Sequence, residues 1–414
     1  MTLPKAHCTF AIPSIHDDLE LDCRIYYPRR TEGSSRVFGR GFAILAHPYA
    51  PLGGCYDDPV VALVGGVLLQ SGYFLTTFNF RGASGSAGRT SWTGKAELGD
   101  YVSVYGFLLC YIDAICRLRP GEEAPVAKPP TLILGGYSYG SMIASHLPSM
   151  DVVVDLFHSP ASGSAESEIR RRATDLSQDA RAYLEMHAAP ATLTVPRVRG
   201  AAGEQTRKPS PGVIMGGYES DAASRRVSRE NSRRSIDGER IRRSIDKIRR
   251  KIGSQPSSPT KPLTKAPPTE STPILPEIAY VLISPILSMA AGLTTMFSKL
   301  RFTRKDREIT PHPGREFHEL TVHPCCCCYG TRDSFTPAGK LQRWTQELQS
   351  QPGSRFVPVR ADTGHFWHEA EGIVRLRQGL AEFLETLGPH NSAPEQSGVA
   401  EIVEAASTSL EEHR

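Results

Sequence analysis

The sequence predicts an α/β fold, in which helices cover both faces of a mostly parallel β-sheet and one long disordered insertion interrupts the domain. Short β-rich apolar runs alternate with longer helical runs along the chain, and this alternation is typical of parallel sheets. Between Tyr183 and Tyr280 the only aromatic residue is Tyr218, while Pro, Ser, Arg and Lys accumulate. Such a stretch buries too little apolar area to offset the entropy lost on ordering, so we expect it to be disordered.

The composition shifts divide the chain into four parts. We expect residues 1–159 and 276–387 to be the two halves of one domain, residues 160–275 to be a basic, Pro- and Ser-rich insertion, and residues 388–414 to be a loose acidic tail. Of the 414 residues, 39% are hydrophobic and 22% are charged, which is close to the usage of ordinary globular proteins. This composition excludes collagen-like, coiled-coil and wholly disordered chains.

The predicted elements follow one another in β-α-β-α order. Asp58 and Pro59 supply an N-cap and a first-turn proline for a helix that ends near Gly72, and further helices are expected at 97–118 and 373–387. The expected strands are, in chain order, 41–47, 74–80, the start of 131–140, 279–285, 323–330 and 355–361. Active groups of such a sheet lie at the carboxyl ends of its strands.

The segment GYSYG, residues 136–140, fits the G-x-S-x-G pattern of a nucleophile elbow. The pattern is short, so the assignment depends on the flanking segments. It follows the apolar strand TLILG and precedes the helix-like run SMIASHL, which is the strand-turn-helix setting of a nucleophile elbow. The turn forces Ser138 into a strained backbone conformation, and side chains at positions 136 and 140 would collide with the neighbouring strand and helix. Ser138 is therefore the candidate nucleophile.

A serine hydroxyl is a poor nucleophile at neutral pH, so it needs a base, and the base needs an acid that orients it. Asp333 stands just beyond one predicted strand, and His365 stands just beyond the next. The chain order Ser138, Asp333, His365 is the order that such a sheet demands of a triad. Asp362 is the alternative acid.

These motifs resemble those of the α/β-hydrolase superfamily over nearly all of 41–387 apart from the insertion. The resemblance extends to His47-Pro48-Tyr49 and to Asn79-Phe80-Arg81-Gly82, which are similar to elements of small esterase-like and dipeptidyl-peptidase-like hydrolases. It implies the α/β-hydrolase fold and an oxyanion hole with two N–H donors. By position one donor is Tyr139, and because Pro48 has no N–H the other is Tyr49 or a near neighbour.

The resemblance and the triad order imply a serine hydrolase that cleaves a small carboxylic ester through an acyl-enzyme. Ser138 is the expected nucleophile, His365 the base and Asp333 the orienting acid. This chemistry needs no cofactor and no metal. Two alternatives stay open: a peptidase that acts on short or proline-containing peptides, because the acyl chemistry is shared, and a non-catalytic scaffold with the same fold.

Three further patterns favour structural roles. The run Gly82–Gly88 is glycine-rich, but it is not G-x-G-x-x-G and no phosphate-binding Lys follows, so we expect no nucleotide site. Cys325–Cys328 are consecutive strand residues that point to opposite faces and cannot converge on one metal ion, so we expect buried small hydrophobes. The uncharged run Ile278–Phe297 is long enough to span a bilayer, but Pro285 and a strand-like start favour a core strand followed by a segment that lines the site.

The insertion contains a strongly basic segment. Residues 225–251 hold twelve Arg or Lys against four Asp or Glu, and isoleucines recur at helical spacing up to Ile252. This pattern predicts a basic amphipathic helix in 225–252 that binds an anionic membrane surface or a protein partner, with a solvated charged linker as the alternative. Candidate protein-kinase sites that follow arginines are Ser228, Ser235 and Ser244. No recognition fold accompanies the charge, so we expect no nucleic-acid partner.

The N-terminus lacks the charged start and continuous apolar stretch of a secretory signal. The nine cysteines show no spacing that suggests a disulfide framework. We therefore expect a cytoplasmic protein, with peripheral membrane association if 225–252 binds lipid.

Overall fold

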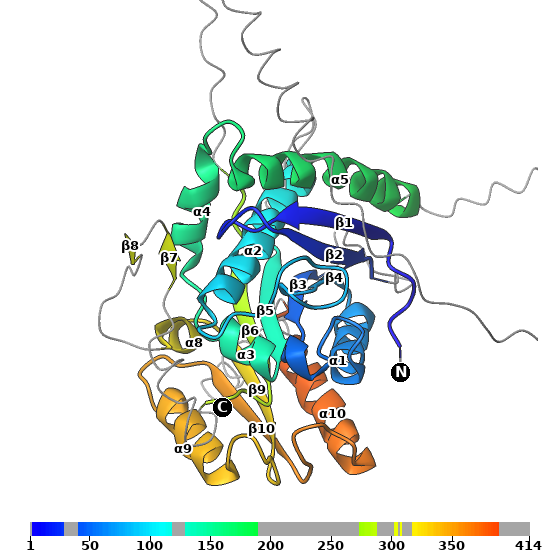
Figure 1. Cartoon of the computed structure of the whole chain (residues 1–414). Coiled ribbons are helices and arrows are strands. Elements are labelled where there is room, and N and C mark those ends of the chain that lie inside the picture. The colour runs from blue at the N-terminus through cyan, green and yellow to red at the C-terminus, as the bar shows by residue number, and fades with distance from the viewer. Residues whose placement is uncertain are drawn as a thin grey trace, which may run out of the picture. The chain divides into compact units, whose positions relative to one another are not determined.

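An eight-stranded β-sheet lies at the centre of the protein, and helices cover both of its faces (Figure 1). The structure is a computed structural model, and the residues that it describes are 2–28, 40–117, 129–188, 273–287, 302–304, 307–308 and 317–388. The strands of the sheet are β1 (Cys8–Pro13), β2 (Glu20–Tyr26), β3 (Gly41–Ala46), β4 (Tyr73–Phe78), β5 (Thr131–Tyr137), β6 (Glu277–Ile283), β9 (Cys325–Gly330) and β10 (Phe356–Ala361).

The strands lie in the order β1-β2-β4-β3-β5-β6-β9-β10. Strand β2 runs antiparallel to both of its neighbours, and the pairs from β4 to β10 are all parallel. The mostly parallel sheet predicted from the sequence is therefore confirmed. A separate short hairpin consists of β7 (Thr303–Arg304) and β8 (Arg307–Glu308).

The helices separate into two layers because alternate residues of each central strand face opposite sides of the sheet. In β3, Phe42 and Ile44 belong to one apolar cluster, whereas Ala43 and Leu45 belong to the other. Helices α1 (Pro59–Gln70) and α10 (Ala370–Thr386) pack on the second face. The helices that contribute to the first face are α2 (Lys95–Cys116), α3 (Tyr139–Ala144), α4 (Met150–His158), α5 (Ala165–Ala188), α8 (His318–Val322) and α9 (Ala338–Gln349).

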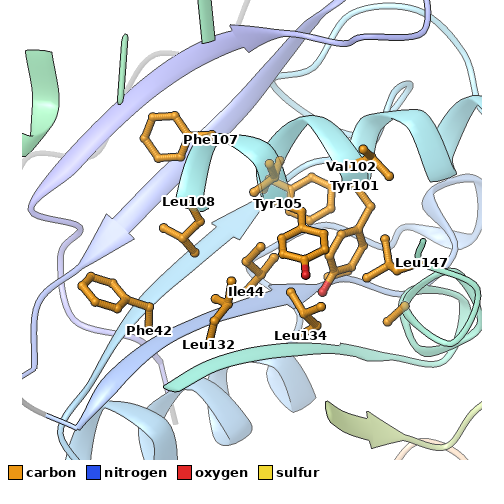
Figure 2. Packing of buried hydrophobic residues seen from close by; sticks show 14 of the residues in the cluster. Phe42, Ile44, Tyr101, Val102, Tyr105, Phe107, Leu108, Leu132, Leu134 and Leu147 are labelled. Carbon is orange, nitrogen blue, oxygen red and sulfur yellow. The ribbon is translucent and has the colours of Figure 1, made fainter. Parts of the chain in front are cut away.

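Helix α2 is the main helix of the first face, and Figure 2 shows it lying across strands β3 and β5. Its side chains Tyr101, Tyr105 and Leu108 are buried against the strands. The strand side chains labelled beneath it are Phe42, Ile44, Leu132 and Leu134. Among the described residues α2 is also the one helix long and apolar enough to cross a membrane, and most of it is buried inside this fold.

The first two strands were not predicted. In both strands every second residue is buried, which is the pattern of a half-buried strand. The buried residues are Phe10 and Ile12 in β1 and Leu21, Cys23 and Ile25 in β2. The predicted N-cap and proline of α1 are present, because the Asp58 carboxylate accepts from the N–H of Val60 at 2.8 Å.

Strand β9 consists largely of the four consecutive cysteines, and all four side chains are fully buried. Cys325 and Cys327 pack in the cluster on one face, whereas Cys326 and Cys328 pack in the cluster on the other. Burial raises the pKa of the Cys325 thiol well above its usual value, which keeps this thiol protonated and unreactive. The prediction that these cysteines act as small core hydrophobes is confirmed.

The uncharged run that begins at Ile278 starts as the central strand β6, between β5 and β9. Its residues 278–283 are buried in the sheet, as the core-strand interpretation predicts, so a membrane-spanning helix over 278–297 is excluded. The part predicted to line the site, residues 288–297, lies outside the described residues.

The predicted disordered insertion starts too early, because residues 165–188 form helix α5. Along one face of α5, Ile169, Ala173, Ala180 and Leu184 are buried in the same cluster as α2 and β1. Arg181 donates from Nε to the carbonyl oxygen of Ile115 near the end of α2, at 3.3 Å. The spacing of residues 169–186 is helix-like in the sequence, but the many charges of this segment led to its assignment to the insertion. The basic segment 225–252, with Ser228, Ser235 and Ser244, and the predicted tail beyond residue 388 lie outside the described residues.

We expect that Ile169→Ala lowers the free energy of unfolding by about 2–5 kcal/mol, because it leaves a cavity where α5 packs on α2. Chemical denaturation measures this change. Gln178→Ala, at an exposed position of the same helix, is the matched control and changes stability by less than about 0.5 kcal/mol. Equal stabilities of the two variants would contradict the packing of α5 as part of the domain.

Candidate active site

Ser138 lies in the sharp turn between β5 and α3, and its backbone is strained. Its φ is 56° and its ψ is −114°, a region that a non-glycine residue rarely adopts and that costs of order 1–3 kcal/mol. The N–H of Ser138 donates to the carbonyl oxygen of Ile283 at 2.8 Å, which ties the turn to the end of β6. The turn therefore holds the hydroxyl at the carboxyl ends of the central strands.

The two glycines of the GYSYG segment are required by close contact. A Cβ atom on Gly136 would lie 2.4 Å from the backbone carbonyl carbon of Gly140, and a Cβ on Gly140 would lie 2.6 Å from the carbonyl oxygen of Ala46. Carbon and oxygen atoms do not approach so closely without displacing the backbone. The turn thus has the steric constraint that the sequence pattern predicts.

The structure brings the three predicted triad residues together. The His365 Nε2 atom lies 2.8 Å from the Ser138 Oγ, and His365 Nδ1 lies 2.7 Å from Asp333 Oδ2. Asp333 also accepts through Oδ1 from the N–H groups of Phe335 and Thr336, which fixes its carboxylate. All three triad side chains are buried. Because a carboxylate only accepts, Nδ1 carries the proton and Nε2 of the neutral imidazole accepts from the serine hydroxyl.

The alternative acid, Asp362, does not reach the imidazole in this arrangement. Its side chain is exposed and accepts from Arg332 Nε at 2.9 Å and from the Thr331 hydroxyl at 3.1 Å. Asp333 is therefore the carboxylate that the structure places against His365.

Ser138, Asp333 and His365 follow β5, β9 and β10, so the triad order along the chain coincides with the strand order of a mostly parallel sheet. A strained Gly-flanked turn that carries the serine completes the arrangement. The chain has the α/β-hydrolase fold. The fold class predicted from the sequence is thus confirmed by the strand order and by the geometry of this turn.

No protein-family model matches the sequence, and no curated protein matches it. Similar solved structures include a serine hydrolase without a lid from Xanthomonas campestris, with 14% identity, coverage of 94% of this chain and 98% of that chain, and a TM-score of 0.43. An esterase from Pyrococcus furiosus has 12% identity, 92% and 90% coverage, and a TM-score of 0.42. The protein Est1E from Butyrivibrio proteoclasticus, solved with ferulic acid bound, has 9% identity, 91% and 98% coverage, and a TM-score of 0.39.

A second buried histidine fixes the loop after β3 in this α/β-hydrolase fold. The N–H of Phe80 donates to His47 Nε2 at 2.9 Å, so the neutral ring carries its proton on Nδ1, which donates to the carbonyl oxygen of Pro48 at 2.6 Å. Burial lowers the pKa of His47 to about 4, so the ring stays neutral at physiological pH. His47 therefore clamps the loop that carries Tyr49 to the segment after β4.

The two predicted oxyanion donors belong to neighbouring segments. Tyr139 is the first residue of α3, and N–H groups at the start of a helix point out of its N-terminal end. The rings of Tyr49 and Tyr139 lie 5.1 Å apart, so the loop after β3 packs against the start of α3. Burial and the nearby Glu97 carboxylate raise the pKa of Tyr49. The assignment of Tyr49 and Tyr139 as donors stays a prediction.

Aromatic side chains that the sequence reasoning missed surround His365. The ring of Phe335 lies 4.3 Å from the imidazole, centroid to centroid, and that of Phe366 lies 5.4 Å away. The Tyr137 hydroxyl donates to the backbone carbonyl of His365 at 3.1 Å. Phe366 follows His365 in the sequence, and Tyr137 precedes Ser138, so their proximity to the motifs was an available signal.

The sequence analysis did not identify two serine hydroxyls that hydrogen-bond to the Ser138 turn and to the loop that carries His365. Ser141 Oγ accepts from the N–H of Ile283 at 2.8 Å and donates to the carbonyl oxygen of Gly136 at 2.5 Å. Ser284 Oγ accepts from the indole N–H of Trp367 at 2.9 Å. Both contacts depend on strand β6, which is remote in sequence, so no local pattern could have indicated them.

Within the ranges that the structure describes, no group of three or more His, Cys, Asp or Glu side chains is arranged to hold a metal ion.

Gly140→Ala is expected to destabilise the fold by about 1–3 kcal/mol, because its Cβ would overlap the carbonyl oxygens of Ala46 and His47. The control is Gly339→Ala in α9, where a Cβ meets nothing within 4 Å and stability stays within about 1 kcal/mol of the parent. Thermal and chemical unfolding of both variants provide the measurement. A Gly140→Ala protein as stable as the control would show that the turn is looser than the structure indicates.

Proposed function

We propose that this chain is a serine hydrolase that cleaves a carboxylic ester through an acyl-enzyme. The observation that carries the proposal is the continuous hydrogen-bond chain from Ser138 Oγ through His365 to Asp333, with distances of 2.8 and 2.7 Å. These are the contacts that convert a serine hydroxyl into a nucleophile at neutral pH.

In the proposed first step, Ser138 Oγ attacks the ester carbonyl while His365 Nε2 takes the hydroxyl proton. Asp333 holds the proton of His365 on Nδ1 and stabilises the imidazolium that forms. The tetrahedral intermediate then collapses, the carbon–oxygen bond to the alcohol breaks, and His365 returns the proton to the departing alkoxide. Water, deprotonated by His365, then attacks the acyl-enzyme. The bond to Ser138 Oγ breaks, the proton returns to Ser138, and the carboxylic acid product is released.

The negative charge on the substrate oxygen needs donors that are already oriented. The N-terminus of α3, which begins at Tyr139, and the backbone of the loop at Tyr49 are the proposed donors. The His47 clamp supports the second of these, because it holds the loop in one position through two backbone contacts.

A buried, fully hydrogen-bonded triad and a strained serine disfavour the scaffold alternative. The positive φ of Ser138 lowers the stability of the fold, and a non-catalytic scaffold would gain nothing from it. Backbone strain of this kind clusters at active sites. Cleavage of short peptides uses the same groups, so substrate profiling with matched esters and amides separates these two classes.

Ser138→Ala is expected to abolish labelling by a fluorophosphonate probe and to reduce hydrolysis of a short p-nitrophenyl ester by several orders of magnitude. The small buried side chain changes little else, so the circular dichroism spectrum and the unfolding midpoint stay near those of the parent. Ser145→Ala is the control for labelling, because Ser145 is a buried serine at the C-terminal end of α3 whose hydroxyl donates to the carbonyl oxygen of Met142. Retained labelling of Ser138→Ala would refute the assignment of the nucleophile.

Asp333→Asn should lower turnover by about 10⁴, because the amide no longer holds the Nδ1–H tautomer of His365. Asp362→Asn is the matched control: it removes a carboxylate of the neighbouring loop that pairs with Arg332, and turnover should stay within about threefold of the parent. Steady-state kinetics on one ester measure both. The acid would be misassigned if Asp362→Asn were the damaging change.

A further inference from the structure

The surface beside His365 is aromatic on the side of the loops that follow β9 and β10. Phe335 and Phe366 lie 5.7 Å apart in an edge-to-face arrangement, and each lies within 5.4 Å of the imidazole. Phe335 is half-buried beside the ring, whereas Phe366 is 52% exposed. A large exposed aromatic side chain next to a reactive group is a candidate for contact with a ligand.

The charged side chains of these two loops pair with one another. Arg332 binds Asp362 at 2.9 Å and Glu369 at 3.2 Å. Those charges therefore satisfy each other at the outer surface of the loops, and the ring of Phe366 packs on Phe335 and on the His368 ring, 5.8 Å away. The group that stands beside the imidazole and remains open to contact is apolar.

The proposed reaction decides which part of the substrate meets this surface. When the carbon–oxygen bond breaks, the proton on Nε2 passes to the alkoxide oxygen, which must come within about 2.6–3.2 Å of Nε2. In the proposed oxyanion hole, the carbonyl oxygen would point instead toward the N–H groups of Tyr49 and Tyr139. The alcohol part of the ester would therefore lie on the histidine side of Ser138. The exposed ring of Phe366 has its centroid 5.4 Å from that of His365 on this side.

We propose that Phe366, packed on Phe335, binds the alcohol part of the ester and selects an apolar or aromatic alcohol. This inference rests on the proposed ester hydrolysis and extends it to a substrate class. Aromatic rings in edge-to-face or offset contact supply both area and orientation, so an aromatic alcohol gains more here than a polar alcohol of similar length.

The test compares benzyl acetate with 2-methoxyethyl acetate, because both form the same acetyl-enzyme and differ only in the alcohol. Wild type is expected to have the higher kcat/KM for benzyl acetate. In Phe366→Ser, kcat/KM for benzyl acetate falls about tenfold more than kcat/KM for 2-methoxyethyl acetate, in line with the loss of an apolar contact. Phe366→Tyr keeps the ring and retains the preference for the benzyl ester.

Trp92→Ser is the matched control. Trp92 is 70% exposed and follows β4, whose place in the sheet is on the other side of β5 from β10, so its loss should leave the ratio of the two kcat/KM values unchanged. An unchanged ratio in Phe366→Ser, or an equal change in Trp92→Ser, would overturn the inference.

Fluorophosphonate labelling separates the two proposals. Wild type that labels at Ser138 but shows no preference between the two alcohols overturns the role of Phe366 and leaves the serine hydrolase assignment intact. Wild type that neither labels nor cleaves either ester overturns both.

Discussion

The active-site arrangement depends on the strained turn at Ser138, and that turn is held by groups from outside it. The carbonyl oxygen of Ile283 in β6 accepts from the N–H of Ser138, and the N–H of Ile283 donates to the Ser141 hydroxyl. The same hydroxyl donates to the carbonyl oxygen of Gly136. Each such hydrogen bond contributes about 0.5–1.5 kcal/mol, so together they offset a backbone strain of about 1–3 kcal/mol. Ser138, the proposed nucleophile, is therefore positioned by the pairing of β5 with β6 as much as by its own motif.

That pairing joins distant parts of the chain. The Ser141–Ile283 hydrogen bond spans 142 positions, and Asp333 and His365, the proposed acid and base, both follow β6 in the sequence. The site consequently needs the residues on both sides of the long segment between α5 and β6. Helix α5, which precedes this segment, packs on α2 and β1.

The sequence predicted the parts of this structure that depend on local patterns. Buried parallel strands such as β3 and β5 are continuous apolar runs, the GYSYG turn needs its glycines for steric reasons, and Asp333 and His365 follow strand ends. Helix α5 has helix-like spacing over 169–186 but was assigned to the insertion because its apolar stripe lies among many charges. Strands β1 and β2 were missed because only alternate residues are buried. The supports of the site, including Ser141, Phe335 and Trp367, depend on contacts between segments far apart in sequence, which periodicity and spacing do not encode.

Two buried histidines of this fold differ in the groups that face their ring nitrogens. His47 and His365 are 0% and 2% exposed. The two ring nitrogens of His47 hydrogen-bond to backbone groups, an N–H at Nε2 and a carbonyl oxygen at Nδ1. Because no charged partner among the described residues offsets the cost of burial, burial penalises the charged form and lowers the pKa of His47 to about 4. It can serve as a neutral clamp, and a proton on Nε2 would break the contact with Phe80. His365 instead faces a carboxylate at Nδ1 and a hydroxyl at Nε2, so a proton that arrives at Nε2 is compensated by the charge of Asp333. Of these two rings, His365 is thus the one that contacts both Ser138 and Asp333, as the proposed reaction requires.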